Sequence, residues 1–345
     1  MFLKKKYQIK LIRPIIVILL VLLLSCQKNN SYRETRLAIS DSSTIPVSFI
    51  VYGSVEPEWN MIFDFIEKQA NLYDYRNTDG PVGKINSEYL AEVPENLYNL
   101  IGLSKKISEI SYGAFDPTIL PVLQLWDFTP GAIPPEKEKI NKAIKKVDFR
   151  KIEIKKDRFI RIPHGFGLDL GGIAKGAIVD ACADLLESQG YNNFLIEAGG
   201  DIILSGVKPQ GKKWIVGIKN PRNRSQLFRK LYIGEAGKRI AIVTSGDYER
   251  FFEYNKKRYH HILNPSTGYP ADKVISVTII ANNCILADGF STASFVLGFE
   301  DGCTLIEQQK DTEGLFVRES EEGLQVKMTE GFSSFLEVKS ISFKE

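Results

Sequence analysis

The sequence predicts an α+β fold in which a largely antiparallel sheet is covered by packed helices. With 345 residues and 43% hydrophobic composition, the chain can bury a large core. Helical periodicity dominates residues 57–190, whereas short apolar runs typical of strands dominate residues 193–281. Strands that follow one another with few helices between them favour antiparallel pairing. No internal repeat or long Pro/Gly-rich linker divides the chain, so we treat residues 46–345 as one domain.

The first half of this domain begins with a strand and continues with helices. Residues 45–53, IPVSFIVYG, predict the opening strand. Residues 57–75 predict a helix, and its apolar residues share one face: Trp59, Ile62, Phe63, Ile66 and Ala70. The turn residues of 76–87, RNTDGPVGKINS, predict a loop. A second amphipathic helix is expected over residues 94–111, ending near Gly113.

Residues 134–190 predict a helix, a hairpin and a longer helix. The first helix covers residues 134–147, and the runs KIEI and RFIRI on either side of 155–157 predict the hairpin. The motif FGLDLGG then leads from a strand into a helix over residues 173–190, which Gly190 ends. We expect its core face to consist of Ile173, Ala177, Ile178, Ala181 and Leu185.

The remainder of the chain is rich in strands. Apolar runs predict strands at residues 193–198, 201–206, 213–219, 231–236, 239–245, 258–263 and 274–281. One late helix, ILADGFSTASFVLG, is expected over residues 285–298. This order of elements supports the antiparallel arrangement.

The N-terminus has the pattern of an export signal. A basic start precedes an apolar run of about ten residues, which is short for a membrane span of roughly twenty. The sequence Leu-Leu-Ser-Cys at 23–26 resembles a bacterial lipobox, so residues 1–25 are expected to be removed and Cys26 to carry lipid. Polar residues 26–45 would form a flexible tether to the membrane. An uncleaved anchor helix is the alternative.

Charge and cysteine content exclude several classes of function. Five of the 45 Lys and Arg lie in residues 1–25, which contain no acid, so 40 face 42 Asp and Glu from Cys26 onward. This near-neutral body argues against nucleic-acid binding. Cys182, Cys284 and Cys303 are far apart and form no CxxC motif, which argues against a disulfide framework and against a thiolate zinc site.

Four clusters place a carboxylate beside glycines, at residues 113–117, 169–176, 197–201 and 244–250. DLGGIAKG, at 169–176, is the most informative because Gly171 and Gly172 lie at a strand-to-helix junction, with Lys175 in the first helical turn. Free amides and the helix dipole at such a junction bind anions, so a phosphate is expected there. Each cluster taken alone is also typical of an ordinary turn.

In the late helix, Asp288 and Thr292 are separated by one turn and project from the same face. A carboxylate and a hydroxyl are hard oxygen ligands, which suit magnesium. The structural alternative is that Asp288 complements the helix dipole and Thr292 bonds to the preceding turn.

Two of the chain's three histidines, His260 and His261, are adjacent and precede an Asn-Pro-Ser-Thr-Gly turn. Consecutive residues of a strand point to opposite faces, so only one imidazole can face a site and the two cannot easily share a metal. The rigid turn would hold the backbone beside that imidazole.

Taken in order, seven motifs resemble those of the ApbE family of FAD:protein FMN transferases, over roughly residues 47–340. They are GAFDPTILPV, DLGGIAKGAIVD, EAGGDI, WIVGIKNP, TSGDYERFF, YHHILNPSTGYPA and ADGFSTASFVLG. The resemblance implies a T-fold-like α+β structure. It also implies a magnesium-dependent enzyme that transfers FMN from FAD to a threonine hydroxyl of an acceptor protein and releases AMP.

The resemblance also assigns roles to residues of this chain. The metal ligands would be Asp288, Thr292 and the main-chain oxygen of Gly172, and the catalytic histidine would be His261, with His260 packing behind it. The expected flavin nucleotide contacts are Ala114, Phe115, Asp116, Asp169, Lys175 and the backbone at Ile262.

The expected partners are therefore FAD and acceptor flavoprotein subunits of membrane redox complexes, with the protein held on the outer, periplasmic or extracytoplasmic side of a membrane through Cys26. Two other functions stay open at this point. One is an FAD pyrophosphatase that gives FMN and AMP. The other is a lipoprotein that binds FAD without catalysis.

Overall fold

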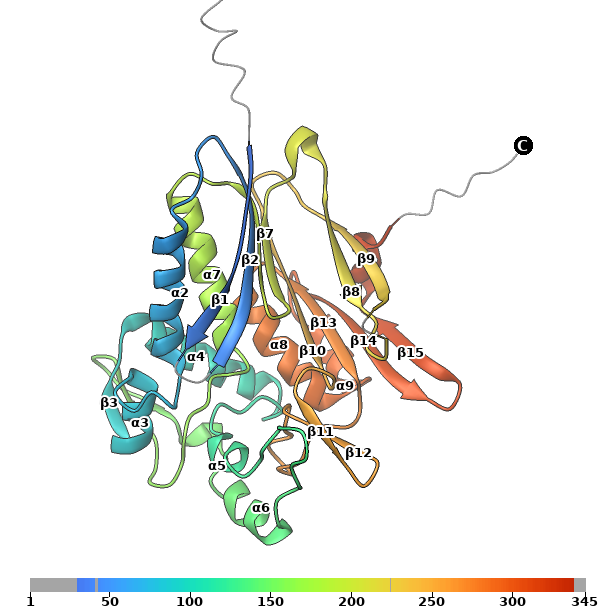
Figure 1. Ribbon diagram of the computed structural model, residues 1–345. Coiled ribbons are helices and arrows are strands. Elements are labelled where there is room, and N and C mark those ends of the chain that lie inside the picture. Colours follow the sequence, from blue (N-terminus) through green and yellow to red (C-terminus); the bar gives the residue numbers. More distant parts are fainter. Residues whose placement is uncertain (1–29, 41–42, 224, 338–345) are drawn as a thin grey trace, which may run out of the picture.

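The structure is a computed structural model that describes residues 30–40, 43–223 and 225–337, and it confirms the α+β fold (Figure 1). An antiparallel eight-stranded sheet has the order β1-β2-β6-β7-β10-β13-β14-β15. Its strands are β1 (Asn30–Ser40), β2 (Ser43–Gly53), β6 (Asn193–Ala198), β7 (Asp201–Ser205), β10 (Arg239–Gly246), β13 (Ser276–Ala281), β14 (Glu313–Ser320) and β15 (Gly323–Met328).

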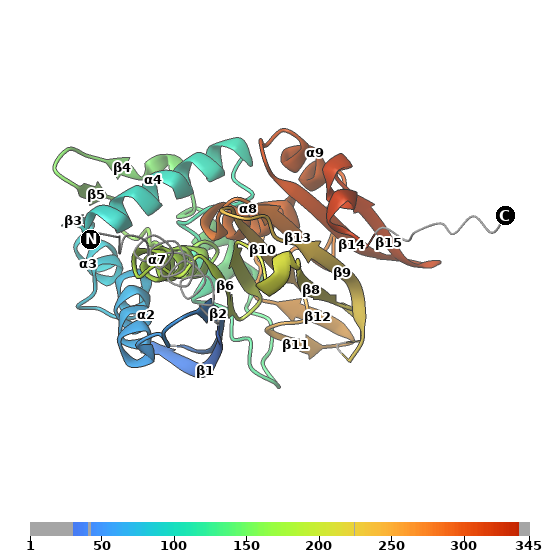
Figure 2. The same ribbon diagram turned by 90° about the horizontal axis from the view of Figure 1, so that it is seen from above.

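Helices cover one face of this sheet and a hairpin covers the other (Figure 2). The helices are α2 (Trp59–Tyr73), α3 (Pro81–Glu88), α4 (Glu95–Ile110), α7 (Ala174–Ser188), α8 (Cys284–Leu297) and α9 (Asp301–Glu307). The hairpin consists of β8 (Trp214–Lys219) and β9 (Leu227–Ile233). Alternation along β10 separates the two layers, because Ala241 and Val243 pack with the helices whereas Ile242 packs with the hairpin.

A smaller aromatic cluster lies below the main core. It joins α5 (Leu120–Leu123) and α6 (Lys137–Ile144) to the hairpin β11 (Phe251–Tyr254) and β12 (Lys257–His260). Trp126 lies at its centre, 5.8 Å from the Tyr269 ring and 6.4 Å from the Phe252 ring. A three-stranded sheet of β3 (Leu90–Glu92), β5 (Phe159–Arg161) and β4 (Glu153–Ile154) contains the predicted hairpin.

Short 3₁₀ helices complete the described chain, at Phe149–Lys151, Pro209–Gly211 and Glu330–Phe335. The helices expected at 57–75, 94–111, 134–147 and 173–190 are present with shorter bounds, and the one expected at 285–298 is shifted by one residue. The strand expected at 258–263 ends at His260, because the chain bends at His261.

Three expectations are wrong. Residues 30–40, expected within a flexible tether, form β1, because they supply backbone partners for the otherwise open edge of β2. Residues 81–88, expected as loop, form α3, which starts with Pro81 at its first turn and buries Val82 and Ile85.

The third concerns the face of α7. Ile178, Ala181 and Leu185 are only partly buried, whereas Val179, Cys182 and Leu186 are buried instead. The helix is covered by α2 on one side and α8 on another, so its buried face is wider than an amphipathic stripe predicts.

The predicted signal segment 1–25 and Cys26 lie outside the described residues. Among residues 30–40, 43–223 and 225–337, no helix is both long and apolar enough to cross a membrane.

Candidate functional site

The N-terminal ends of α7 and α8 meet in close contact at the centre of the molecule. A Cβ atom on Gly176 would lie 2.4 Å from the main-chain oxygen of Cys284, so only glycine allows this approach. The Gly176 amide donates to Oδ2 of Asp288 (3.1 Å). Asp180 accepts from the amides of Cys284 and Ile285, both at 2.8 Å, and caps α8. Burial raises the pKa of Asp180 to about 6.

A charged cluster lies beside this junction. Lys175 Nζ contacts Oδ1 of Asp201 and lies 4.0 Å from Oδ1 of Asp288. The two aspartates are only 1% and 3% exposed. Burial, followed by the nearby Asp288 carboxylate, raises the pKa of Asp201. Burial alone would lower the pKa of Lys175, but the two carboxylates outweigh it and raise that pKa. One ammonium group therefore faces two acids.

The turn before α7 and the helix α8 each bring a further oxygen to this cluster. Thr292 Oγ1 lies 3.4 Å from the main-chain oxygen of Gly172, although 120 residues separate them in the sequence. A Cβ atom on Gly172 would lie 3.1 Å from the Phe115 ring and 3.2 Å from Thr292. The structure therefore brings together Gly172, Asp288 and Thr292, the three predicted metal-ligand residues.

The donor set fits a hard divalent cation. Two carboxylates, one hydroxyl and one carbonyl oxygen are the ligand types that magnesium takes. Oδ2 of Asp201 is buried without a hydrogen-bond partner among the described residues, as expected for an oxygen that binds a ligand. Among the described residues, no group of three His, Cys, Asp or Glu side chains could hold a metal ion. A metal site here would therefore also need the Thr292 hydroxyl and the Gly172 carbonyl.

The two adjacent histidines have different surroundings. His260 is 4% exposed, its Nε2 lies 2.7 Å from the carbonyl oxygen of Ala271, and its Nδ1 accepts from the Ile262 amide (3.3 Å). Its ring also packs edge-on against Phe295, at 5.4 Å. Because a carbonyl can only accept, Nε2 carries the proton. His260 is thus a buried packing residue.

His261 is half-buried and makes two contacts with one carbonyl oxygen. The main-chain oxygen of Arg250 lies 3.1 Å from the His261 amide and 3.2 Å from its Nδ1. The carbonyl fixes the proton on Nδ1 and leaves Nε2 as a free base. Burial, followed by the positive charge of Arg250 and more weakly that of Lys175, lowers the pKa of His261 to about 3. The imidazole is therefore neutral at physiological pH.

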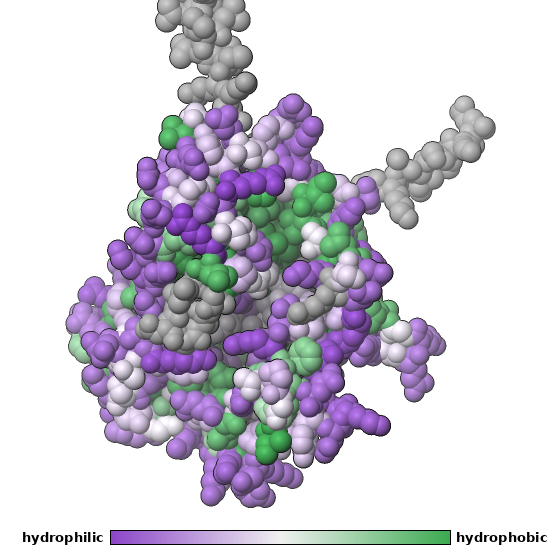
Figure 3. All heavy atoms as spheres, in the orientation of Figure 1, coloured by the Kyte–Doolittle hydropathy of each residue, from purple (hydrophilic) through white to green (hydrophobic). Residues whose placement is uncertain are grey.

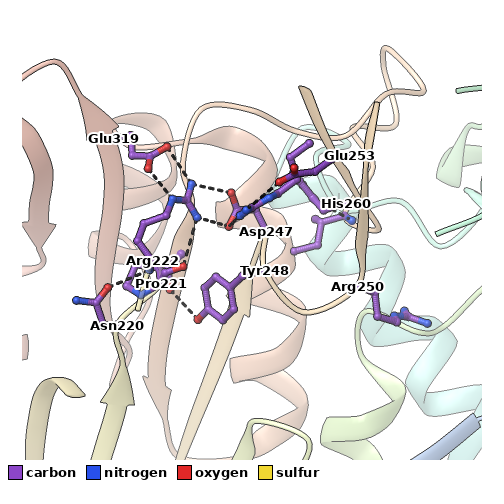
Figure 4. Close-up of polar contacts among 12 residues, drawn as sticks. Asn220, Pro221, Arg222, Asp247, Tyr248, Arg250, Glu253, His260 and Glu319 are labelled. Carbon is purple, nitrogen blue, oxygen red and sulfur yellow. Dashed lines mark hydrogen bonds and ion pairs between the residues drawn. The ribbon is translucent and has the colours of Figure 1, made fainter. Parts of the chain in front are cut away.

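An ion-pair network holds the segment that supplies this carbonyl (Figure 4). Arg222 donates to both oxygens of Asp247 (2.8 and 2.9 Å) and also to Glu319. Arg258 lies 3.5 Å from the Asp247 carboxylate. The network fixes the start of the turn that ends at Arg250, whose side chain points away from it in Figure 4.

The predicted flavin contacts 114–116 lie beside the Gly172 turn. Phe115 is buried against Gly172, and Ala114 is partly buried. The Asp116 carboxylate accepts from the Thr118 amide (2.8 Å) and from the Phe149 amide (3.0 Å), and burial raises its pKa. This carboxylate therefore fixes the turn that presents Ala114 and Phe115.

Asp169 lies at the other side of the same turn and is half-buried. Asn86 holds the preceding residue by two hydrogen bonds, accepting from the Leu168 amide (2.7 Å) and donating to its carbonyl (3.0 Å). Burial raises the pKa of Asp169, and the nearby positive charges of Arg76 and Arg250 oppose this shift. Asp169, Arg76 and Arg250 thus converge near His261.

Sequence reasoning missed two acids of this site. Asp201 belongs to the EAGGD cluster, which we noted without assigning it a role, and Asp180 is not among the residues expected on the core face of α7. Gly199 and Gly200 adopt positive φ values of 57° and 98°, and this turn delivers Asp201 to Lys175. The backbone of Ile262, predicted to contact the nucleotide, is engaged within the protein: its carbonyl accepts from the Ala271 amide at 3.0 Å and its amide donates to His260 Nδ1.

Comparisons with known proteins find relatives in both sequence and fold. A model of the ApbE family matches residues 43–316. An FAD:protein FMN transferase of Treponema pallidum is 32% identical over 277 residues, covering 74% of this chain and 75% of its own. An FAD:protein FMN transferase of Vibrio cholerae is 31% identical over 295 residues, covering 82% of this chain and 85% of its own. Among solved structures, an ApbE protein of Thermotoga maritima matches with a TM-score of 0.77 and 31% identity, over 90% of this chain and all of its own. The flavin transferase ApbE of Vibrio cholerae matches with a TM-score of 0.76 and 26% identity, over 89% of this chain and all of its own.

Proposed function

The chain belongs to the ApbE family, and we infer from this membership that it is an FAD:protein FMN transferase. It moves FMN from FAD to acceptor flavoproteins. Beyond this activity, we propose a magnesium requirement, residue roles and an acceptor threonine. The single observation that carries the proposal is the convergence of Gly172, Asp288 and Thr292 beside Asp201 and Lys175.

The oxygens of Asp288, Thr292, Gly172 and Asp201 would hold a magnesium ion at the diphosphate of FAD. Bound magnesium would neutralise negative charge that develops as the diphosphate bond breaks. The positive end of the α7 dipole and the ammonium of Lys175 would orient the same diphosphate. Phe115 would pack against a ring of the nucleotide.

His261 would act as the general base. Its Nε2 would take the proton from the acceptor threonine as the hydroxyl oxygen attacks the FMN phosphorus, and the bond between the two phosphates would break to release AMP. The Arg250 carbonyl would stabilise the imidazolium that forms, through the Nδ1–H hydrogen bond. The lowered pKa of His261 means that the base is unprotonated before the reaction starts.

The test is an AMP-release assay. Purified protein is incubated with FAD, with and without magnesium, and with and without an acceptor flavoprotein subunit, and AMP is quantified by chromatography. We expect magnesium-dependent AMP that increases with the acceptor, together with a covalent FMN adduct by mass spectrometry. Equal AMP with and without acceptor would indicate an FAD pyrophosphatase, and no AMP under any condition would indicate FAD binding alone.

We also propose that Cys26 carries lipid and holds the domain outside the cytoplasm, near membrane redox complexes that contain its acceptors. The lipobox-like sequence at 23–26 supports this proposal. Labelled palmitate should enter the wild-type protein but not a Cys26→Ala variant. Label in both proteins, or in neither, would contradict the proposal.

A further inference from the structure

A cavity of about 500 Å³ lies between α3, α5 and α6, in the lower part of the molecule. Its apolar wall includes Leu120, Leu125, Phe166 and Tyr89, and its rim carries Lys139, Lys142 and Lys146. Lys139 and Lys142 lie three residues apart on α6 and Lys146 lies in the turn that follows it, while Ile140 of α6 packs into the core. The surface around α6 is largely hydrophilic (Figure 3). The cavity therefore combines an apolar floor with a cationic rim.

Two of these ammonium groups lack an anionic partner in the described part of the chain. Lys139 pairs with Glu136 at 3.0 Å. The ammonium groups of Lys142 and Lys146, by contrast, form no ion pair or hydrogen bond with any described residue. Lys146 Nζ lies against Gly165, since a Cβ atom there would approach it to 2.9 Å. Uncompensated positive charge at the rim of an apolar cavity favours an anionic ligand.

The cavity is built from segments that also form the candidate site. Gly167 lines it, and Asn86 lines it while holding the backbone of Leu168, next to Asp169. On the other side, a Cβ atom on Gly268 would lie 2.5 Å from Ile140 of α6, and Trp126 Nε1 donates to the Gly268 carbonyl (3.0 Å). The turn that follows His261 is thus fixed to the helix that carries the lysines.

We propose that this cavity binds an acidic segment of the acceptor protein, next to the hydroxyl that receives FMN. This inference rests on the proposed function, which requires a protein acceptor beside His261. The proposed nucleotide site lies between α7 and α8, so the lysine-rimmed cavity is available to the second substrate. Lys142 and Lys146 would select carboxylate side chains, and the apolar wall would take their aliphatic or aromatic neighbours.

The test uses fluorescence anisotropy with three labelled peptides and the purified full chain. The peptides share a central threonine and differ only in four flanking positions, which are all Asp, all Asn or all Lys. We expect the Asp peptide to bind wild-type protein about tenfold more tightly than the Asn peptide, with the preference falling as salt rises. Equal binding of the Asp and Asn peptides would overturn the proposal.

A charge swap makes the test independent of folding defects. The double variant Lys142→Glu/Lys146→Glu should lose the preference for the Asp peptide and gain binding of the Lys peptide, a gain that misfolding cannot produce. Lys212→Glu/Lys213→Glu, at exposed positions beside β8, makes the same charge change elsewhere and should keep the wild-type preference. The milder Lys142→Ala/Lys146→Ala variant should fall between them.

Three outcomes would overturn the assignment. The first is a charge-swapped protein that still prefers the Asp peptide. The second is a charge-swapped protein that melts at the wild-type temperature and binds the Lys peptide no more tightly than wild type does. The third is displacement of the Asp peptide by millimolar inorganic phosphate, which would assign the cavity to a small anion. Absence of AMP release from FAD by wild-type protein with magnesium and an acceptor flavoprotein would instead refute the proposed function, while the peptide preferences are measured without FAD.

Discussion

The α7–α8 junction and the β11–β12 hairpin region both supply residues to the candidate site, but different forces hold them. At the junction, the acids are almost fully buried and the helices touch through a glycine. In the hairpin region, Arg258 of β12 is 29% exposed at the side chain and contacts Asp247. Arg222, from the connection between β8 and β9, is 27% exposed and contacts the same carboxylate. The junction is therefore built by close packing, whereas the imidazole of His261 is positioned by hydrogen bonds at a partly solvated edge.

The largest effect should come from the junction. Asp288→Asn removes the negative charge that faces Lys175 and the metal position, so magnesium-dependent AMP release should fall by about 10³-fold or more. Asp184→Asn is the control, because Asp184 is an exposed residue of α7 that pairs with Arg239. Initial rates by chromatography measure both variants. Activity within a few-fold of wild type for Asp288→Asn would refute the metal assignment.

In the hairpin region, only one of the two histidines should affect the catalytic rate. His261→Asn removes the base, and AMP release should fall by about 10²-fold while FAD still binds. His260→Asn loses a buried ring and its bond to Ala271, so it should instead lower the free energy of unfolding, by about 1–3 kcal/mol. Single-turnover kinetics and urea denaturation compare the two variants. Exchange of the two phenotypes would show that the wrong imidazole was chosen.

Packing at the junction can be tested without changing any charge. Gly176→Ala should reduce the free energy of unfolding by about 2–3 kcal/mol, because its methyl group would collide with the Cys284 carbonyl. Gly102→Ala on α4 is the matched control, since its nearest contact would be an ordinary 3.8 Å and alanine favours helix. Urea denaturation measures both. Equal stability of the two variants would mean that the helix contact is looser than the structure indicates.

The ion pairs of the hairpin region should contribute less. Arg222→Met leaves Asp247 with only the more distant Arg258, so the free energy of unfolding should fall by about 1–2 kcal/mol. A moderate loss of catalytic rate should accompany it, as the Arg250 carbonyl becomes less well fixed. Lys238→Met, which breaks an exposed pair with Glu235, should change neither quantity measurably. A rate loss without any stability loss would assign Arg222 a direct role.

The smallest effect is a pH dependence. The folded protein holds the pKa of His261 at about 3, below its usual value of about 6.5, so only the unfolded chain takes up this proton between those values. Stability is therefore complete above pH 6.5 and decreases as pH falls. For a half-buried ring we expect about 1 kcal/mol between pH 7 and pH 5. His261→Asn should reduce this slope, and His260, whose pKa is also lowered, should account for part of what is left. An unchanged slope would contradict the burial of His261.

Sequence reasoning succeeded for features that depend on residues close together in the chain. The spacing of Asp288 and Thr292 follows from helical periodicity, and strand alternation predicted different surroundings for His260 and His261, although β12 ends at His260. Both were available from the sequence because they are local. Asp116 shows the limit of a local motif, since its carboxylate caps its own turn through Thr118 and Phe149. Nothing in the sequence indicates whether such an acid serves the turn or a ligand.

Long-range pairing accounts for what the sequence did not show. β1 has a polar composition and becomes a strand because the edge of β2 lies beside it. Asp201 gains its role from Lys175 and Asp288, which lie 26 residues before it and 87 residues after it. The lysine-rimmed cavity likewise needs α3, α5 and α6 to meet.

By itself, the sequence determined the class of fold, the order of most helices and strands, and the motifs that resemble a flavin transferase family. These depend on periodicity and turn chemistry within about twenty residues. Only the tertiary structure decided which motifs share a site, which acids are buried together and how far the pKa values of His261 and Asp201 move from their usual values. Desolvation and electrostatic contacts depend on neighbours that the fold brings from distant parts of the chain.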